Sequence, residues 1–338
     1  MQRTCRDLLL VGSMAVAIAL GANSGSPPAV PHYDHIFLVV EENHGYKQIL
    51  GNKAAPNLNN LAQTYGLATQ YFSVADPSAP NYVAMLGGNF FGIADDNAYY
   101  YHTVDQPSLM SQLDAANLTW KGYYQQMPYP GYKGLCYPGR CGGVPDFDTL
   151  YNSKHNGVPY FKSVQDNPSE MLKMTPLAQL TADLASGDVP SFGYIVPDEC
   201  HDMHGAPPWC VDSSKPGSAQ DQYLVTQADT LVAQWVAQIT SAAFWTSGNN
   251  AIVITFDEGN GTAGCCDANP GTGQVFTVVV TNNGPRALQD PTPYNHYSLL
   301  QTFQQAFGLG CLQFTCDTTN VTPMAALFAA PGAKRSTR

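Results

Sequence analysis

The segment His35-Ile-Phe-Leu-Val-Val40 is a continuous apolar run with several β-branched residues, and it ends abruptly at Glu41-Glu42-Asn43. A run without polar alternation is typical of a strand that is buried on both faces. Residues 191–196 and 250–256 repeat the pattern, and residues 275–281 form a fourth predicted strand. Strands of this kind predict a sheet that helices cover on both sides.

Helical segments alternate with these strands along the chain. Another helix is predicted to open at Tyr82, and apolar residues recur at helical spacing in residues 55–65, 108–116, 176–186, 220–243 and 299–307. The alternation predicts an α/β protein, a three-layer α/β/α sandwich with a mostly parallel central sheet, in one domain over residues 23–338. Residues 89–170 are rich in Tyr, Gly, Pro and Asn and lack periodicity, so we expect a loop-rich cap or insertion there.

The first residues have the pattern of a secretory signal peptide. Arg3 and Arg6 precede an apolar run over residues 8–20, and small residues follow it. We therefore predict a signal peptide at residues 1–22, with cleavage between Gly21 and Gly25, and a secreted protein that is extracellular or periplasmic. No later segment reaches the roughly 18 consecutive apolar residues of a membrane-spanning helix.

The cysteines fit an oxidising compartment. Nine are present, and one of them, Cys5, lies in the predicted leader. Short spacings favour three local disulfides, Cys136–Cys141, Cys200–Cys210 and Cys311–Cys316. The adjacent Cys265 and Cys266 leave two alternatives open, a vicinal bridge or partners elsewhere. No Cys-x-x-Cys pair occurs, so a disulfide scaffold is favoured over a zinc site.

The chain is acidic, with 15 Lys and Arg against 26 Asp and Glu and a formal net charge of −11. Without a basic run, such a chain is not expected to bind nucleic acid or an anionic membrane through its charge. A phosphate ester would also approach against this field, so a substrate of that class requires a local positive centre, and a bound metal is the natural candidate. The expected form is a monomer.

Polar clusters follow three of the predicted buried strands, at Glu42-Asn43, at residues 198–204 and at Asp257-Glu258. A single Asp-Glu pair after a strand is more often a solvated turn. Three clusters weaken that interpretation, because ligands of open α/β sheets bind outside the carboxyl ends of the strands. Gathered carboxylates repel one another unless a cation compensates them. Oxygen ligands favour Ca²⁺, Mg²⁺ or Mn²⁺, and histidines would also admit Zn²⁺.

Ser78 lies in the turn Asp76-Pro-Ser-Ala-Pro80, just before the helix predicted at Tyr82. A serine at this position is commonly an N-cap, whose side-chain oxygen accepts a hydrogen bond from a free backbone N–H group. The same position also suits a nucleophile that carries phosphate, because the N–H groups and the helix dipole favour anions.

Five motifs resemble the bacterial and fungal phosphoesterase family, which includes secreted acid phosphatases and phospholipases C. They lie between residues 34 and 309 in the expected order: Glu42-Asn43 with Gly51-Asn52 and Ala55-Pro56, Pro77-Ser-Ala-Pro-Asn-Tyr-Val-Ala-Met-Leu-Gly-Gly88, Asp202-Met-His204, Thr255-Phe-Asp-Glu258 and Asn295-His-Tyr-Ser-Leu-Leu-Gln-Thr302. The resemblance implies an alkaline-phosphatase-like fold. It also implies a metal-dependent acid phosphatase that hydrolyses phosphate monoesters through a covalent phosphoserine. A phospholipase C or another phosphodiesterase is the alternative enzyme, and an inactive secreted binding protein is the alternative outside enzymes.

The resemblance also assigns roles to residues. Ser78 matches the nucleophile and Asn81 a ligand of the phosphoryl oxygens, and the matches to metal ligands are Glu42, Asn43, Asp257 and Glu258. Three further residues match either a second metal site or phosphate-binding and acid/base groups: Asp202, His204 and His296. Two departures from the family pattern are Asp76, where His is usual before Pro-Ser, and Gly205, where Asp is usual.

The remaining histidines lack a motif. His102, in a tyrosine-rich stretch, and His201, beside the Asp202-Met-His204 motif, are candidates for phosphate binding or a second site. His32, His35, His44 and His155 are predicted to be structural or exposed, and Asp229 is predicted to support the site or the fold.

Overall fold

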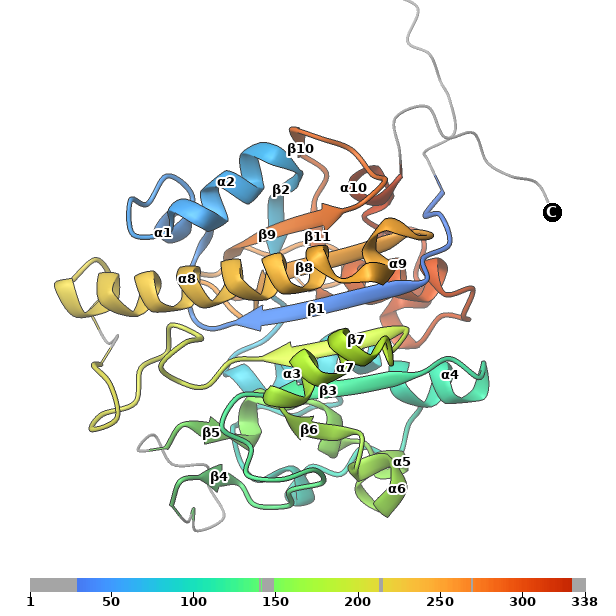
Figure 1. Ribbon diagram of the computed structural model, residues 1–338, viewed down its shortest axis with the longest axis horizontal. Coiled ribbons are helices and arrows are strands. Elements are labelled where there is room, and N and C mark those ends of the chain that lie inside the picture. Colours follow the sequence, from blue (N-terminus) through green and yellow to red (C-terminus); the bar gives the residue numbers. More distant parts are fainter. Residues whose placement is uncertain (1–28, 140, 142–148, 213–214, 269, 330–338) are drawn as a thin grey trace, which may run out of the picture.

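The computed structural model describes residues 29–139, 141, 149–212, 215–268 and 270–329 (Figure 1). The predicted signal peptide lies outside the described residues. In the part of the chain that the structure describes, no helix is long and apolar enough to cross a membrane.

A nine-stranded sheet forms the centre of the molecule, in the order β10-β2-β9-β8-β1-β7-β3-β6 with β11 beside β2. Its strands are β1 (His35–Glu41), β2 (Gly66–Phe72), β3 (Trp120–Tyr124), β6 (Met174–Pro176), β7 (Phe192–Val196), β8 (Asn250–Phe256), β9 (Gln274–Thr281), β10 (Leu288–Asp290) and β11 (Tyr294–Asn295). All pairings are parallel except those of β9, which runs antiparallel to β8 and β2. The predicted α/β fold with a mostly parallel sheet is confirmed.

Helices cover both faces of the sheet. The helices α2 (Pro56–Thr64), α7 (Ala178–Ser186) and α8 (Ala219–Ser241) pack beside one another in front of the sheet in Figure 1. A second group packs together: α3 (Ser78–Gly87), α4 (Leu109–Ala115) and α9 (His296–Ala306). Strand β1 lies between the layers, and residues 36–40 are fully buried, as expected for an apolar run without alternation.

Shorter elements lie outside this frame. The hairpin β4 (Cys136–Tyr137) and β5 (Tyr151–Asn152) forms a second, small sheet. The short α-helices are α1 (Tyr46–Ile49), α5 (Lys162–Gln165), α6 (Pro168–Met171) and α10 (Ala325–Phe328). The 3₁₀ helices are η1 (Tyr99–Tyr101), η2 (Ser153–His155), η3 (Val158–Tyr160), η4 (Ala243–Thr246) and η5 (Gln313–Cys316).

The range 89–170, which the sequence predicted to be a loop-rich cap, contains one strand of the central sheet. Strand β3 pairs with β7 on one side and β6 on the other. Lys121 and Gly122 interrupt its apolar pattern, which is why periodicity did not reveal it. The Lys121 ammonium is 2.7 Å from the Asp183 carboxylate of α7, so the charge is paired at the surface of the fold. The chain therefore leaves the sheet only after Tyr124, and it returns at β6. We call residues 125–173 the excursion.

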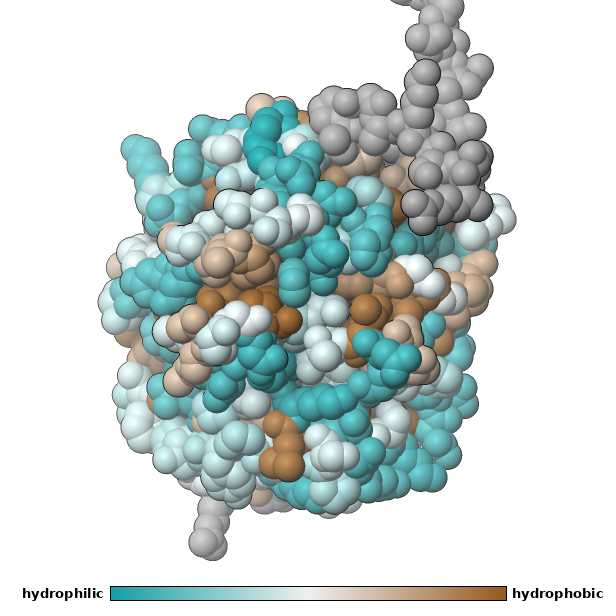
Figure 2. Space-filling view, turned by 45° about the vertical axis from the view of Figure 1, so that its right-hand side comes forward, coloured by the Kyte–Doolittle hydropathy of each residue, from teal (hydrophilic) through white to brown (hydrophobic). Residues whose placement is uncertain are grey.

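Disulfides join cysteines that are close in sequence: Cys136–Cys141, Cys200–Cys210, Cys265–Cys266 and Cys311–Cys316. The adjacent pair Cys265–Cys266 thus forms the vicinal bridge. On the face shown in Figure 2, apolar residues form separate patches divided by hydrophilic residues.

One close approach connects the excursion to α3. A Cβ at Gly157 would lie 2.5 Å from the backbone oxygen of Tyr82, so this position has no room for a side chain. We predict that Gly157→Ala destabilises the protein by about 1–3 kcal/mol, because the backbone of α3 or of residues 153–160 has to move. Urea unfolding measures the change.

The matched control is Gly310→Ala, since Gly310 is exposed and no atom lies within 4 Å of the position of its Cβ. Equal stabilities of the two variants would contradict the packing described here.

Candidate active site

The candidate site lies at the carboxyl ends of β1, β7 and β8. These strands are adjacent and parallel, so the residues that follow them meet at one edge of the sheet. The three polar clusters of the sequence thus come together, and all of their carboxylates are buried: Glu42, Asp198, Glu199, Asp202, Asp257 and Glu258.

Ser78 is the first residue of α3, and the N-cap position belongs to Pro77. The Ser78 hydroxyl donates a hydrogen bond to Oε2 of Glu42 at 3.0 Å. The N-cap interpretation of Ser78 is therefore wrong, because the side chain bonds across to β1 and not to its own helix. The helix also begins four residues before Tyr82, since Pro80 is compatible with a first turn, where its missing N–H group costs nothing.

Glu42 is the residue on which these contacts converge. Its Oε2 accepts hydrogen bonds from Ser78 and from the Asn43 side chain at 2.8 Å. Its Oε1 accepts one from the Tyr82 hydroxyl at 2.9 Å and lies 3.1 Å from Nε2 of His155. Burial, together with the charges of Asp257 and Asp202, raises the pKa of Glu42 well above its ordinary value.

Asp257 lies beside this group. Its Oδ1 accepts hydrogen bonds from the backbone N–H groups of Asn43 at 3.1 Å and Glu258 at 2.6 Å. Its Oδ2 is buried and accepts no hydrogen bond from the described residues. Burial raises the pKa of Asp257, and burial together with the Asp257 charge raises that of Glu258. A buried carboxylate oxygen without a hydrogen bond, next to carboxyl groups whose pKa is raised, is unfavourable. A divalent cation bound there would offset this cost.

A second part of the site surrounds His155. Its Nδ1 is 3.2 Å from Oδ2 of Asp202 and 3.4 Å from Oε1 of Glu199. Burial lowers the pKa of His155 well below its ordinary value, and the neighbouring Lys154 and His204 charges lower it further. Two overlapping sets of side chains have ligand atoms close enough to share a metal ion: Glu42, His155 and His204, and His155, Glu199 and Asp202.

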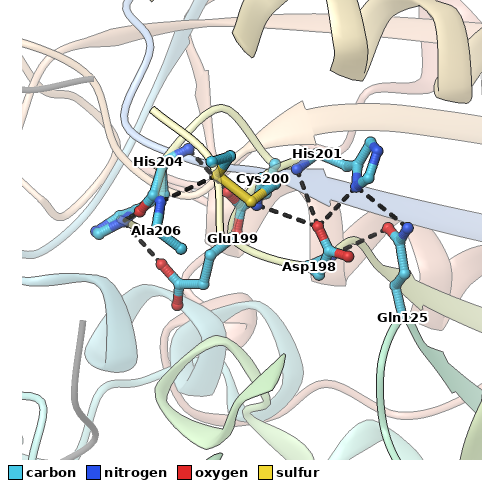
Figure 3. The surroundings of a disulfide bond; sticks show 10 residues. Gln125, Asp198, Glu199, Cys200, His201, His204 and Ala206 are labelled. Carbon is cyan, nitrogen blue, oxygen red and sulfur yellow. Dashed lines mark hydrogen bonds and ion pairs between the residues drawn. A yellow bond between two sulfur atoms is a disulfide. The ribbon is translucent and has the colours of Figure 1, made fainter. Parts of the chain in front are cut away.

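His204 is held by Glu199. Its Nδ1 is 2.7 Å from Oε2 of Glu199, and Figure 3 shows the two side chains on the same side of the Cys200–Cys210 disulfide. Its Nε2 is 3.5 Å from the ammonium of Lys154. Burial alone would lower the pKa of His204, but the Glu199 carboxylate outweighs it and raises the pKa above its ordinary value.

The sequence pattern of the Phosphoesterase family matches residues 52–310. The chain belongs to this family. It is 29% identical over 333 residues to the phosphatidylinositol-3-phosphatase of Mycobacterium tuberculosis, a match covering 95% of this chain and 94% of that protein. It is 27% identical over 283 residues to an acid phosphatase of Aspergillus fumigatus, covering 83% of this chain and 56% of that protein. The chain thus spans little more than half the length of this fungal relative.

Solved structures with the same architecture belong to proteins of low sequence identity. A protein in the alkaline phosphatase superfamily from Vibrio parahaemolyticus has a TM-score of 0.51 at 11% identity, covering 91% of this chain and 72% of that one. The lipoteichoic acid synthase LtaP from Listeria monocytogenes has a TM-score of 0.55 at 11% identity, covering 87% and 76%. At such identity the likeness shows the fold alone, and it confirms the alkaline-phosphatase-like fold of this phosphoesterase.

Asn81 shapes the turn before Ser78. Its Oδ1 accepts hydrogen bonds from the backbone N–H groups of Val74 at 3.2 Å and Ala75 at 3.0 Å, and its Nδ2 donates to the Ala75 carbonyl at 2.7 Å. The same nitrogen is 3.5 Å from Oε2 of Glu258. In this structure the amide thus holds the loop that presents Ser78, beside the predicted metal ligands.

His296 lies behind Asp257. Its Nε2 donates a hydrogen bond to the Asp257 carbonyl at 2.6 Å, and its Nδ1 accepts one from the Tyr71 hydroxyl at 3.0 Å. Both ring nitrogens are therefore bonded to the protein, and the residue is fully buried. This geometry positions the backbone of the Asp257-Glu258 loop.

His201 and His102 lie apart from the buried group. Nδ1 of His201 is 2.7 Å from Oδ1 of Asp198, and Figure 3 shows this pair on the other side of the disulfide from His204. Nε2 of His102 is 2.5 Å from Oδ1 of Asp95. Both histidines are partly exposed, and the contacts of the described residues do not join either one to Ser78.

Of the two alternatives predicted for His155, structural or exposed, the exposed one is wrong, because the residue is buried beside Glu42. Lys154 was not singled out at all. Both lie in η2, within the range that lacked periodicity, so no predicted strand or helix could place them. Their signal in the sequence is only the adjacency of two basic side chains, Lys154-His155, in a chain otherwise poor in them.

Other supporting residues stabilise the frame. His44 is buried, with Nδ1 3.0 Å from the Glu42 carbonyl and Nε2 2.9 Å from Asp221 of α8. Asp229 of α8 accepts hydrogen bonds from the backbone N–H groups of Asn57 and Leu58 at the start of α2. Nδ1 of His35 is 2.9 Å from the Pro190 carbonyl, and His32 is exposed.

Burial of His296 has a consequence for the pH dependence of stability. Burial lowers its pKa to about 4, against an ordinary value of 6.5. The unfolded chain therefore binds the proton more readily, so this stabilisation is complete above about pH 6.5 and is lost as the pH falls to about 4. Between these values the protein should lose up to about 3 kcal/mol more stability than a His296→Gln variant.

Urea unfolding of both proteins at several pH values measures this difference. His32→Gln, which changes an exposed histidine, is the control and should follow the unsubstituted protein. Parallel stability curves for His296→Gln and the unsubstituted protein would contradict a neutral, buried His296.

Proposed function

We propose that this protein is a secreted, metal-dependent acid phosphatase that hydrolyses phosphate monoesters through a phosphoserine at Ser78. The observation that carries the proposal is the 3.0 Å hydrogen bond from the Ser78 hydroxyl, at the start of α3, to the buried Glu42 carboxylate. The names of the relatives, an acid phosphatase and a phosphatidylinositol-3-phosphatase, support hydrolysis of phosphoric esters.

The chemistry begins at the serine. The Ser78 hydroxyl already donates its proton towards Glu42, so an acceptor is in place when the oxygen attacks phosphorus. The start of α3 faces the same point, and its backbone N–H groups and dipole favour the phosphoryl oxygens. The Lys154 ammonium adds a positive charge among the surrounding acids, which raise its pKa against the effect of burial.

The leaving oxygen requires a proton, and the proposal assigns its donation to His204. Because Glu199 raises its pKa, His204 is protonated at mildly acidic pH, and Nε2, on the side of the ring that faces Lys154, would carry the transferred proton. Once deprotonated, the same imidazole can accept a proton from the water that hydrolyses the phosphoserine. As the pH rises, His204 loses its proton and can no longer act as the acid. This would account for activity at acidic pH.

The donor set suits a hard divalent cation. The carboxylates of Glu42, Asp257 and Glu258 and the side-chain oxygen of Asn43 would hold it, and Ca²⁺, Mg²⁺ or Mn²⁺ fits oxygen ligands best, with Zn²⁺ possible through His155 and His204. When bound, the cation would lower the pKa of the Ser78 hydroxyl and offset the phosphoryl charge.

Secretion is supported by the cysteines. Four disulfides join the eight cysteines of residues 23–338, and such bridges persist in oxidising compartments. The signal-peptide pattern of residues 1–22 points to the same route.

Ser78→Ala should reduce hydrolysis of p-nitrophenyl phosphate by at least about a thousandfold, because the covalent route is removed. The control is Ser298→Ala, since the buried Ser298 hydroxyl has no hydrogen-bond partner among the described residues. It should keep nearly full activity. Turnover by Ser78→Ala at the level of the unsubstituted protein would refute the phosphoserine, and faster cleavage of bis-p-nitrophenyl phosphate than of the monoester would favour a phosphodiesterase.

Metal dependence is tested at Asp257. Asp257→Asn should lower the content of bound divalent metal and the activity together, whereas Asp105→Asn, at an exposed acid paired with Lys162, should change neither. Metal content measured by mass spectrometry and activity after EDTA treatment provide the readouts. Full activity of EDTA-treated protein that contains no metal would exclude the proposed cation.

A further inference from the structure

The start of α3 has few free hydrogen-bond donors. Pro77 and Pro80 have no backbone N–H group, and the N–H of Asn81 is the first that can bond within the helix. The donors left for an anion are therefore the N–H groups of Ser78 and Ala79. A phosphoryl group on Ser78 would depend on these donors and on nearby positive side chains.

One of these donors is already occupied by a carboxylate. Oδ1 of Asp96 accepts the Ala79 N–H at 3.0 Å. Oδ2 of the same side chain lies 3.7 Å from the Lys154 ammonium. Asp96 thus contacts both an N–H donor at the start of α3 and the ammonium of Lys154. A carboxylate and a phosphoryl group compete for the same kind of donor.

We propose that Asp96 occupies the phosphoryl subsite of the free enzyme and that the phosphoryl group of the substrate displaces it. Asp96 is then a specificity-determining residue that weakens the binding of free phosphate. This inference rests on the proposed function, because it takes the start of α3 as the place where the phosphoryl group binds.

The position of Asp96 suits such a displacement. It lies in the irregular segment between α3 and η1, and its side chain is 21% exposed, so it can turn towards solvent without moving a strand of the sheet. Its return after the reaction would restore a negative charge beside the product. The dianion of inorganic phosphate is repelled most, which favours product release.

The alternative is that Asp96 only caps α3. The two roles differ in charge, because a neutral amide oxygen can accept the Ala79 N–H but does not repel phosphate. Asp96→Asn therefore keeps an acceptor for the helix and removes the competing charge. Asp105→Asn changes the net charge equally, at an exposed acid in the same part of the chain, and is the matched control.

Binding of inorganic phosphate to the metal-supplied protein is measured by isothermal titration calorimetry, with inhibition of p-nitrophenyl phosphate hydrolysis by phosphate in the same preparations. We expect Asp96→Asn to bind phosphate about tenfold more tightly and to be inhibited at correspondingly lower phosphate, because a like charge within a few ångströms is removed. Asp105→Asn should match the unsubstituted protein.

Unchanged or weaker phosphate binding by folded Asp96→Asn would overturn the inference and leave Asp96 as a helix cap. Asp96→Ser, which retains a shorter acceptor, serves if thermal unfolding shows that the asparagine variant is not folded, and the same two outcomes apply to it. If the unsubstituted protein neither hydrolyses the ester nor binds phosphate, the proposed function itself fails. If it does both and only the expected gain is missing, the role of Asp96 alone is refuted.

Discussion

The hydrogen bond between Ser78 and Glu42 joins the first turn of α3 to the end of β1, and the remaining site is arranged around it. Glu42 is fully buried, so both of its oxygens require partners, and they find them in Asn43, Tyr82 and His155. Tyr82 belongs to α3 like Ser78, Asn43 follows Glu42, and His155 belongs to η2. The position of the serine therefore depends on the packing of α3 and η2 against the end of β1.

The site gathers carboxylates in a buried place, where the loss of hydration and their mutual repulsion are unfavourable. Asp257 keeps a buried oxygen without a hydrogen-bond donor among the described residues, and burial raises the pKa of Glu42, Asp257 and Asp202. Buried carboxylates that lie close together repel one another, and positive charge between them offsets the repulsion. The acids at this end of the sheet therefore lower the stability of the fold wherever positive charge does not compensate them.

Prediction from the sequence succeeded for residues that directly follow a strand with a clear apolar pattern. Strands β1, β7 and β8 are uniformly apolar, so the carboxylates that follow them could be placed at one edge of the sheet. It failed for β2 and β3, whose polar residues Thr69, Gln70 and Lys121 disguise a strand. It also could not place His155 near Glu42, because a residue outside the regular strands and helices is positioned by tertiary contacts, which periodicity does not reveal. The helix start at Ser78 was missed because two prolines obscured the first turn.

The antiparallel direction of β9 has an evolutionary consequence. Since β9 runs opposite to its neighbour β8, the loop of residues 257–273 leaves the sheet and returns to it at the same edge. Insertions or deletions within this loop would alter the rim of the site while leaving the strand register untouched. The loop opens with Asp257 and Glu258 and later contains the Cys265–Cys266 bridge, and the carbonyls of both cysteines accept hydrogen bonds from the Asn295 side chain. A change in the length of this one connection would therefore reshape the surroundings of Asp257 and Glu258 and leave the order of the strands as it is.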